Sequence, residues 1–315
     1  TLILSGNNSY NGGTTISAGT LQLGNANALG TGSATIGASG KLDLNGQTIA
    51  NAITTITAGA LLTNSSASAA TLSAAIGSSS ASQVGNFTVG AAGNITLSDV
   101  FAANGTTLTK TGSGTLTLGG VNNNNVSGAN PLGTLTVNNG LVKLSKTGTA
   151  TAADSATVNT GGTLQMDPAH TTTGWQSWAG QLNGGVTLAG GTLDLNGVSG
   201  QNNLIRSLSG SSGLVTNSST TAAELQITAR DSSTITYSGT IADGPGAGKV
   251  SVTFSSSGTT GSGRINVFSG ANTYSGDTTI NFATLELGSA NAVQNSTVNL
   301  AASSGLGSNP SLFEF

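Results

Sequence analysis

The chain has 315 residues, of which only 6% are charged and 4% are aromatic, while glycine alone contributes 48 residues. Because ordinary globular proteins carry about a quarter charged residues, this composition excludes a conventional rounded core, and the net charge of -3 with abundant Leu, Ile, Val and Thr argues against disorder. The eight scattered Lys and Arg residues exclude the basic stripe that nucleic acids need, and the absence of cysteine excludes a disulfide framework.

Short apolar–polar–apolar triplets recur along the chain, each after a turn of small residues. Such alternation predicts a strand with one buried face, and Gly and Asn at its ends predict tight turns. Neighbouring triplets start 21 residues apart (Leu21 to Leu42) or 22 apart (Val142 to Leu164). The triplets are Leu21–Leu23, Leu42–Leu44, Leu116–Leu118, Val142–Leu144, Leu164–Met166, Leu193–Leu195 and Leu285–Leu287.

A strand–turn unit of this length cannot bury its apolar face alone, but it can when it stacks on a copy of itself. We therefore predict an all-β fold, a parallel β-helix (β-solenoid) with short loops, over residues 1–315 as a single continuous domain. The outer Leu residues of each triplet are expected to point inward. The middle residues Gln22, Asp43, Asp194 and Glu286 are expected to point outward, the acids as solvated charges.

Two stretches complicate the regular pattern. The alanine-rich segment Ala67–Ile76 permits a helix or a strand. Met166–Gly185 contains both Trp residues, the only His and one of four Pro residues, and it is predicted to form a longer loop that protrudes from the coil.

The chain also repeats longer segments. "SGNNSYNGGTTISAGTLQLGNANAL" starts at Ser5, and "SGANTYSGDTTINFATLELGSANAV" starts 264 residues later at Ser269. "LDLNG" occurs at Leu42 and Leu193, and "TNSSASAATL" at Thr63 is echoed by "TNSSTTAAEL" at Thr216. These echoes indicate duplication of a larger unit of several strands.

The two long segments, with "TKTGSGTLTLGG" at Thr109–Gly120, resemble the autotransporter passenger-associated β-strand repeat. The resemblance implies a right-handed parallel β-helix that is displayed on, or secreted from, a Gram-negative cell. It also implies export through a C-terminal transmembrane β-barrel, which would be the chain's only contact with a membrane. The present sequence is expected to be a fragment of such a longer chain.

An enzyme is the weakest of the functions that we weighed. A β-helix carbohydrate-active enzyme needs paired carboxylates, and the eleven acids are dispersed. A serine-protease triad would depend on His170 as the only base, and one His without Cys is too little for zinc. We expect no catalytic residue, no metal and no cofactor.

The function favoured by the sequence is that of a structural or adhesive extracellular rod, which acts as spacer, coat or adhesin. The alternative is a subunit of a self-assembling extracellular fibre, because both ends of the chain lack a polar cover. The expected partners are host-cell or matrix glycans and proteins, or the chain itself.

If the chain binds a partner at a single place, the candidate is the predicted loop, because loops on rigid scaffolds often carry binding sites. It holds Asp167, His170, Trp175 and Trp178. The two indoles are predicted either to form a binding platform or to fold back over an apolar strip of the coil.

Overall fold

The structure is a computed structural model. It describes residues 1–77, 87–99, 106–120, 133–147, 151–167, 181–199, 204–229, 232–256, 264–301 and 311–314. The chain forms two compact units, Thr1–Ser155 and Ala156–Phe315. The single-domain organisation over residues 1–315 stays a prediction.

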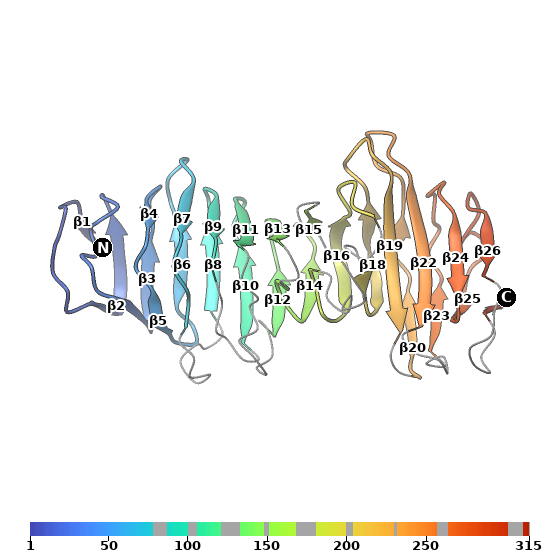
Figure 1. Cartoon of the computed structure of the whole chain (residues 1–315), viewed down its shortest axis with the longest axis horizontal. Helices are drawn as coiled ribbons and strands as arrows, with labels where there is room; N and C mark the ends of the chain where they lie inside the picture. Colours follow the sequence, from blue (N-terminus) through green and yellow to red (C-terminus); the bar gives the residue numbers. More distant parts are fainter. Residues whose placement is uncertain are drawn as a thin grey trace. The chain divides into compact units, whose positions relative to one another are not determined.

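Unit 1 consists of short strands (Figure 1). Each strand stacks on another strand that lies about twenty to thirty residues away in the sequence. The strands are β1 (Leu2–Leu4), β2 (Thr14–Leu23), β3 (Ala34–Asp43), β4 (Thr48–Ile49), β5 (Ile53–Ile56), β6 (Leu61–Asn64), β7 (Ala70–Leu72), β8 (Phe87–Ala91), β9 (Ile95–Leu97), β10 (Thr107–Thr111), β11 (Thr115–Gly120), β12 (Thr134–Val137) and β13 (Gly140–Lys146).

Unit 2 repeats this design (Figure 1). Its strands are β14 (Ser155–Asn159), β15 (Gly162–Met166), β16 (Val186–Asp194), β17 (Leu204–Ile205), β18 (Leu208–Thr216), β19 (Ala223–Ala229), β20 (Thr234–Tyr237), β21 (Thr240–Ile241), β22 (Val250–Ser256), β23 (Ile265–Phe268), β24 (Thr278–Asn281), β25 (Thr284–Leu287), β26 (Val298–Leu300) and β27 (Leu312–Glu314).

The strands pair in parallel with strands of the next turn of the chain, which is the pattern of a β-solenoid. In unit 1 one ladder runs β6–β8–β10–β12 and a second runs β7–β9–β11–β13. In unit 2 the ladders β19–β22–β24–β26 and β20–β23–β25–β27 continue the same arrangement. The predicted all-β parallel solenoid is confirmed, and the segment Ala67–Ile76 contributes strand β7.

The core of each unit is a set of columns of small and medium apolar side chains. Leu21 lies beside Leu42, which lies beside Leu62, and all three are buried. Of the Leu residues predicted to point inward, only Leu287 is merely half-buried. Side chains of like shape therefore stack between successive turns, each of which we call a rung, and the fold needs few large residues.

Candidate functional site

The first departure from the sequence prediction concerns Asp43 and Asp194. We predicted that both carboxylates would be solvated on the outer face, and this is wrong, because their side chains are 3% and 5% exposed. Both lie at the end of a strand where the chain turns a corner of the solenoid. Gln22 and Glu286, the corresponding middle residues of two other triplets, are half-exposed.

Each buried carboxylate is surrounded by hydrogen-bond donors from the rung before and the rung after. Asp43 Oδ2 accepts from Gln22 Nε2 at 2.9 Å and from Ser65 Oγ at 2.6 Å. Asp43 Oδ1 accepts from the backbone N–H groups of Asn45 and Ser65 at 3.1 and 3.0 Å. One acid therefore ties three consecutive rungs together.

The second corner repeats this arrangement atom for atom. Asp194 Oδ2 accepts from Gln165 Nε2 at 2.7 Å and from Ser218 Oγ at 2.6 Å. Asp194 Oδ1 accepts from the N–H groups of Asn196 and Ser218 at 3.0 and 2.9 Å. We call these sets the Asp43 corner and the Asp194 corner.

Both corners turn through an Asn-Gly pair. Asn45 and Gly46 have φ values of 45° and 78°, and Asn196 and Gly197 have 48° and 74°. Positive φ at both central residues defines a type I′ turn, for which Asn-Gly is the favoured pair. The echoed "LDLNG" is therefore the turn of each corner.

The echoed "TNSS" supplies the next rung of the same corner. Asn64 Oδ1 accepts from the N–H groups of Gly46 and Ser66 at 2.9 and 3.1 Å. Asn217 Oδ1 accepts in the same way from Gly197 and Ser219 at 2.8 and 3.2 Å. Both amides are fully buried, so the two echoes that the sequence showed separately form one structure.

The environment of Asp43 favours its charged form. Burial by itself disfavours the carboxylate, but the hydrogen bonds from Ser65, Gln22 and Asn45 outweigh this penalty and lower the pKa of Asp43 below 3.8. Its two oxygens accept four hydrogen bonds from structural groups. Asp43 is therefore built to hold rungs together, and its oxygens are not free to transfer a proton to a substrate.

Two lysines are buried as well. Lys110 Nζ donates to the carbonyl oxygens of Thr111, Gly112 and Asn139 at 2.9, 2.7 and 3.2 Å, which uses all three of its protons. Lys146 Nζ donates to the carbonyl oxygen of Asp99 at 3.1 Å. Burial lowers the pKa of each amine to about 8, although the charge of Asp99 partly opposes this shift at Lys146.

The two long repeated segments keep the same hydrogen bonds. Asn8 Nδ2 donates to the carbonyl oxygen of Ala28 at 2.7 Å, and Asn272 Nδ2 donates to that of Ala292 at 2.8 Å. The hydroxyl of Tyr10 lies 2.8 Å from Thr14 Oγ1. The hydroxyl of Tyr274 lies 2.6 Å from Thr278 Oγ1. The 264-residue sequence repeat is therefore also a structural repeat.

The burial of the two copies differs. Tyr10 is 39% exposed, whereas Tyr274 is 1% exposed. The second copy follows another rung, from which the N–H of Ile241 donates to Asn272 Oδ1 at 2.7 Å. Burial raises the pKa of the Tyr274 hydroxyl.

The predicted binding loop is only partly described. His170, Trp175 and Trp178 lie outside the described residues. Asp167 follows β15 directly and is half-buried. The rung on either side of the loop is well fixed, since Met166 is buried and its carbonyl oxygen accepts from Asn196 Nδ2 at 3.1 Å.

In the described ranges, no three His, Cys, Asp or Glu side chains come together in a way that could hold a metal ion. The same ranges contain no helix that is long and apolar enough to cross a membrane. The two corners and the contacts of Lys110 and Lys146 are polar groups that the structure gathers, and both kinds join rungs.

The family model of the passenger-associated-transport-repeat matches residues 1–23, 108–144 and 257–292. The chain carries the passenger-associated-transport-repeat in these three segments. Neither a curated protein nor a solved structure matches it. The matched segments contain the Tyr10 and Tyr274 hydrogen bonds and the buried Lys110.

This repeat is a feature of autotransporter passenger domains and is not an enzyme family. It implies an extracellular or surface location for the repeat protein. The location agrees with what the sequence resemblance led us to expect.

Sequence reasoning missed the two corners, although the sequence contains a signal for them. "LDLNG" precedes "TNSS" by a similar distance in both copies, since Asn64 follows Asp43 by 21 residues and Asn217 follows Asp194 by 23. That distance is one rung, so the two motifs had to be neighbours in space. Alternation alone predicts that the middle residue of a triplet points outward, so it does not reveal that Asp43 and Asp194 contact the next rung.

Proposed function

We propose that this repeat protein is a structural segment of a passenger domain on the surface of, or secreted from, a Gram-negative cell, where it acts as a spacer or coat. The observation that supports this role is the Asp43 corner with its copy at Asp194. The carboxylates of Asp43 and Asp194 make their hydrogen bonds to residues of the neighbouring rungs. Such joints stiffen a solenoid without disulfides or surface charge.

A surface-display experiment tests the structural role. The 315-residue chain is placed between an outer-membrane anchor and an epitope, and antibody binding to intact cells is measured. A double variant, Asp43→Ala with Asp194→Ala, and a Gly/Ser linker of equal length serve as comparisons. We expect the wild-type segment to expose the epitope well, and the double variant and the linker to expose it poorly. Equal exposure by the linker would contradict a structural role.

Adhesion through the Met166–Gly185 loop is a second proposal, supported by how firmly the loop is anchored. Met166 ends β15 and is buried, and β16 begins at Val186. A segment that leaves one rung and returns at the next can project Asp167, His170 and the two Trp residues on a rigid base. Glycans or proteins of a host surface are the partners that aromatic side chains suit.

Deletion of residues 170–178 with a short Gly/Ser bridge tests the adhesive proposal. Binding to cells or immobilised glycans is measured beside the circular dichroism spectrum, with Trp175→Ala/Trp178→Ala as a milder variant. Lost binding with an intact β spectrum supports the site. Unchanged binding contradicts it, and unfolding of both variants shows instead that the two indoles cover the coil.

A further inference from the structure

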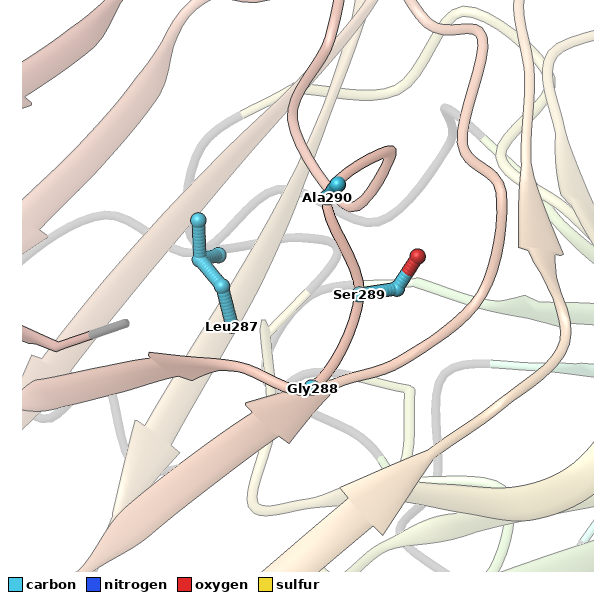
Figure 2. A pocket seen from close by; sticks show the side chains of 4 residues that line it. All are labelled: Leu287, Gly288, Ser289 and Ala290. Carbon is cyan, nitrogen blue, oxygen red and sulfur yellow. The ribbon is translucent and has the colours of Figure 1, made fainter.

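The cavity at the turn after β25 does not have the lining of a ligand site. It has a volume of about 550 Å³, and Leu287, Gly288, Ser289 and Ala290 line it (Figure 2). Of these four residues only Ser289 has a polar side chain, and its Oγ accepts from the backbone N–H of Asn291 at 3.2 Å. A ligand site needs several polar groups that converge on one point. Reactive chemistry lies elsewhere, in the Asn-Gly pairs of the chain.

An Asn residue that precedes Gly can lose its side-chain amide without an enzyme, because Gly has no Cβ to shield its nitrogen. The Gly nitrogen gives up its proton to water and attacks Cγ of the Asn. The bond from Cγ to the side-chain nitrogen then breaks, and that nitrogen takes up a proton and leaves as ammonia. Water opens the resulting succinimide ring. Attack of water at Cγ gives Asp. Attack at the original backbone carbonyl gives isoaspartate, in which that carbonyl has become a free carboxylate.

The Asn-Gly pairs differ in how firmly the fold holds them. Asn183 is held by Arg206, whose Nη2 donates to Asn183 Oδ1 at 3.0 Å, whereas Asn11 is exposed. The pairs within the described residues are Asn11–Gly12, Asn45–Gly46, Asn139–Gly140, Asn183–Gly184 and Asn196–Gly197.

The pairs at the two corners are closed to this reaction. Asn45 Nδ2 donates to the carbonyl oxygen of Leu23 in the rung before, at 2.9 Å. The N–H of Gly46 donates to Asn64 Oδ1 in the rung after, also at 2.9 Å. The Asp194 corner holds its Asn-Gly pair in the same way. The two groups that must meet are therefore tied to different rungs, and the ring can close only after the corner has opened.

The pair Asn139–Gly140, at the turn that leads into β13, has the opposite arrangement. Asn139 is exposed, and the N–H of Gly140 donates to Oδ1 of Asn139 itself at 2.8 Å. The side chain is therefore folded back over the next peptide, which brings Cγ beside the nitrogen that attacks it. The turn also requires this Gly, because φ of Gly140 is 73° and a Cβ there would lie 2.5 Å from the carbonyl oxygen of Gly112.

The buried amine of Lys110 lies next to this pair. Its Nζ donates to the backbone carbonyl oxygen of Asn139 at 3.2 Å, and it would lie 3.0 Å from a Cβ at Gly140. As an ammonium group, Lys110 favours the negative charge that develops on the attacking nitrogen. The carbonyl that accepts from Lys110 is also the group that becomes a carboxylate in isoaspartate. The product therefore gives Lys110 an oppositely charged partner.

We propose that Asn139–Gly140 is a site at which the folded chain deamidates spontaneously, and that the isoaspartate formed there directs its new carboxylate at Lys110. The reaction adds a negative charge inside the segment 108–144 that the family model matches. The fraction of modified chains rises with time after folding, while the two corners keep their Asn-Gly turns unchanged. This modification goes beyond the roles proposed above and does not depend on them.

Peptide mass spectrometry of the 315-residue chain, aged for several weeks at pH 7.4, tests the site. It measures the fraction of acid at Asn45, Asn139 and Asn196, and labelling by an isoaspartyl methyltransferase identifies isoaspartate. A parallel sample in guanidinium chloride gives the rates without the fold. In the folded chain, Asn139 is expected to react at least about tenfold faster than either corner, because only the corners must open first. In the denatured chain the three rates should agree within about threefold. Equal rates in the folded chain, no reaction at Asn139, or a tenfold difference that persists in denaturant would each overturn the proposal.

Cross-linking of the aged chain with a carbodiimide tests the contact with Lys110. This reagent joins a carboxylate directly to a neighbouring amine, so a link between residues 110 and 139 is expected in the aged wild-type chain and not in a fresh one. Asn139→Gln should prevent the link, because the longer side chain cyclises far more slowly. Asn138→Gln changes the exposed neighbour and is the matched control, which should age and link like the wild type. Circular dichroism reports whether each variant keeps its β structure. Absence of the link from chains that contain isoaspartate at position 139 overturns the Lys110 contact, and so does equal linking by Asn139→Gln.

Discussion

The first long repeat and its copy in unit 2 share side-chain hydrogen bonds of Asn and Tyr, yet Tyr10 is 39% exposed and Tyr274 is 1% exposed. The hydroxyl of Tyr10 and that of Tyr274 each contact the Thr four residues on. The buried copy differs in having a rung before it. The backbone N–H of Ile241 in that rung donates a hydrogen bond to Asn272 Oδ1. The comparison indicates that the repeat sequence specifies the local hydrogen bonds, whereas the burial of its tyrosine comes from the neighbouring rung, and we expect its stability to follow the burial.

The largest expected difference between the two copies concerns the tyrosines. Tyr274→Ala removes a fully buried ring and is expected to lower the free energy of unfolding by about 3–5 kcal/mol. Tyr10→Ala removes a ring that is already partly in water and is expected to cost about 1 kcal/mol. Urea unfolding at low protein concentration measures both changes. Equal costs would show that the preceding rung does not determine burial.

The corners give the opposite comparison, because both have rungs on both sides. Asp43→Thr and Asp194→Thr should each cost about 2–4 kcal/mol, since either change removes a buried acceptor that takes four hydrogen bonds. The two variants are expected to agree within about 1 kcal/mol, because matched contacts have matched energies. Urea unfolding measures both changes. If either substitution leaves the free energy of unfolding nearly unchanged, the Asp side chain points outward into solvent, as the sequence predicted.

The paired asparagines provide a smaller contrast. Asn272→Ala leaves the N–H of Ile241 and the carbonyl of Ala292 without their partner in a buried site, and should cost about 2 kcal/mol. Asn8→Ala affects the carbonyl of Ala28 in a half-buried site, and should cost about 1 kcal/mol. Thermal unfolding of the two variants side by side measures this difference. A larger loss at Asn8 would contradict the account.

Much of the fold could be predicted from the sequence, because alternation is local. The triplets gave the strands, and their Leu residues are buried as expected, apart from the half-buried Leu287 at the last rungs. The corners could not be predicted by alternation, since the donors to Asp43 come from Gln22 and Ser65, about one rung away on either side. Only the register between rungs reveals that a charged residue in the middle of a triplet is enclosed.

A further expected effect concerns the pH dependence of stability. Lys110 and Lys146 have pKa values of about 8 in the folded protein, against 10.5 for an ordinary lysine. Between pH 8 and 10 the unfolded chain therefore binds more protons, and stability rises with pH by up to about 1.4 kcal/mol per unit for each lysine. Above pH 10 the trend reverses, because burial raises the pKa of Tyr237 and Tyr274.

Lys110→Met should halve this slope, since only Lys146 then contributes. Lys143→Met is the matched control, because Lys143 is half-exposed and lies on β13, the same strand as the buried Lys146. Urea midpoints at pH 8, 9 and 9.5 measure the slope for each protein. A slope that Lys110→Met leaves unchanged would contradict the buried-amine account.

Backbone hydrogen exchange of the two long repeats tests most directly the claim that a neighbouring rung determines burial and stability. Peptides that cover residues 5–29 and 269–293 are compared by mass spectrometry in one dilute sample, so both copies experience the same solvent. We expect the second copy to exchange at least about tenfold more slowly than the first, a difference of about 1.4 kcal/mol in opening free energy. Equal exchange in the two copies, or slower exchange in residues 5–29, would contradict the account.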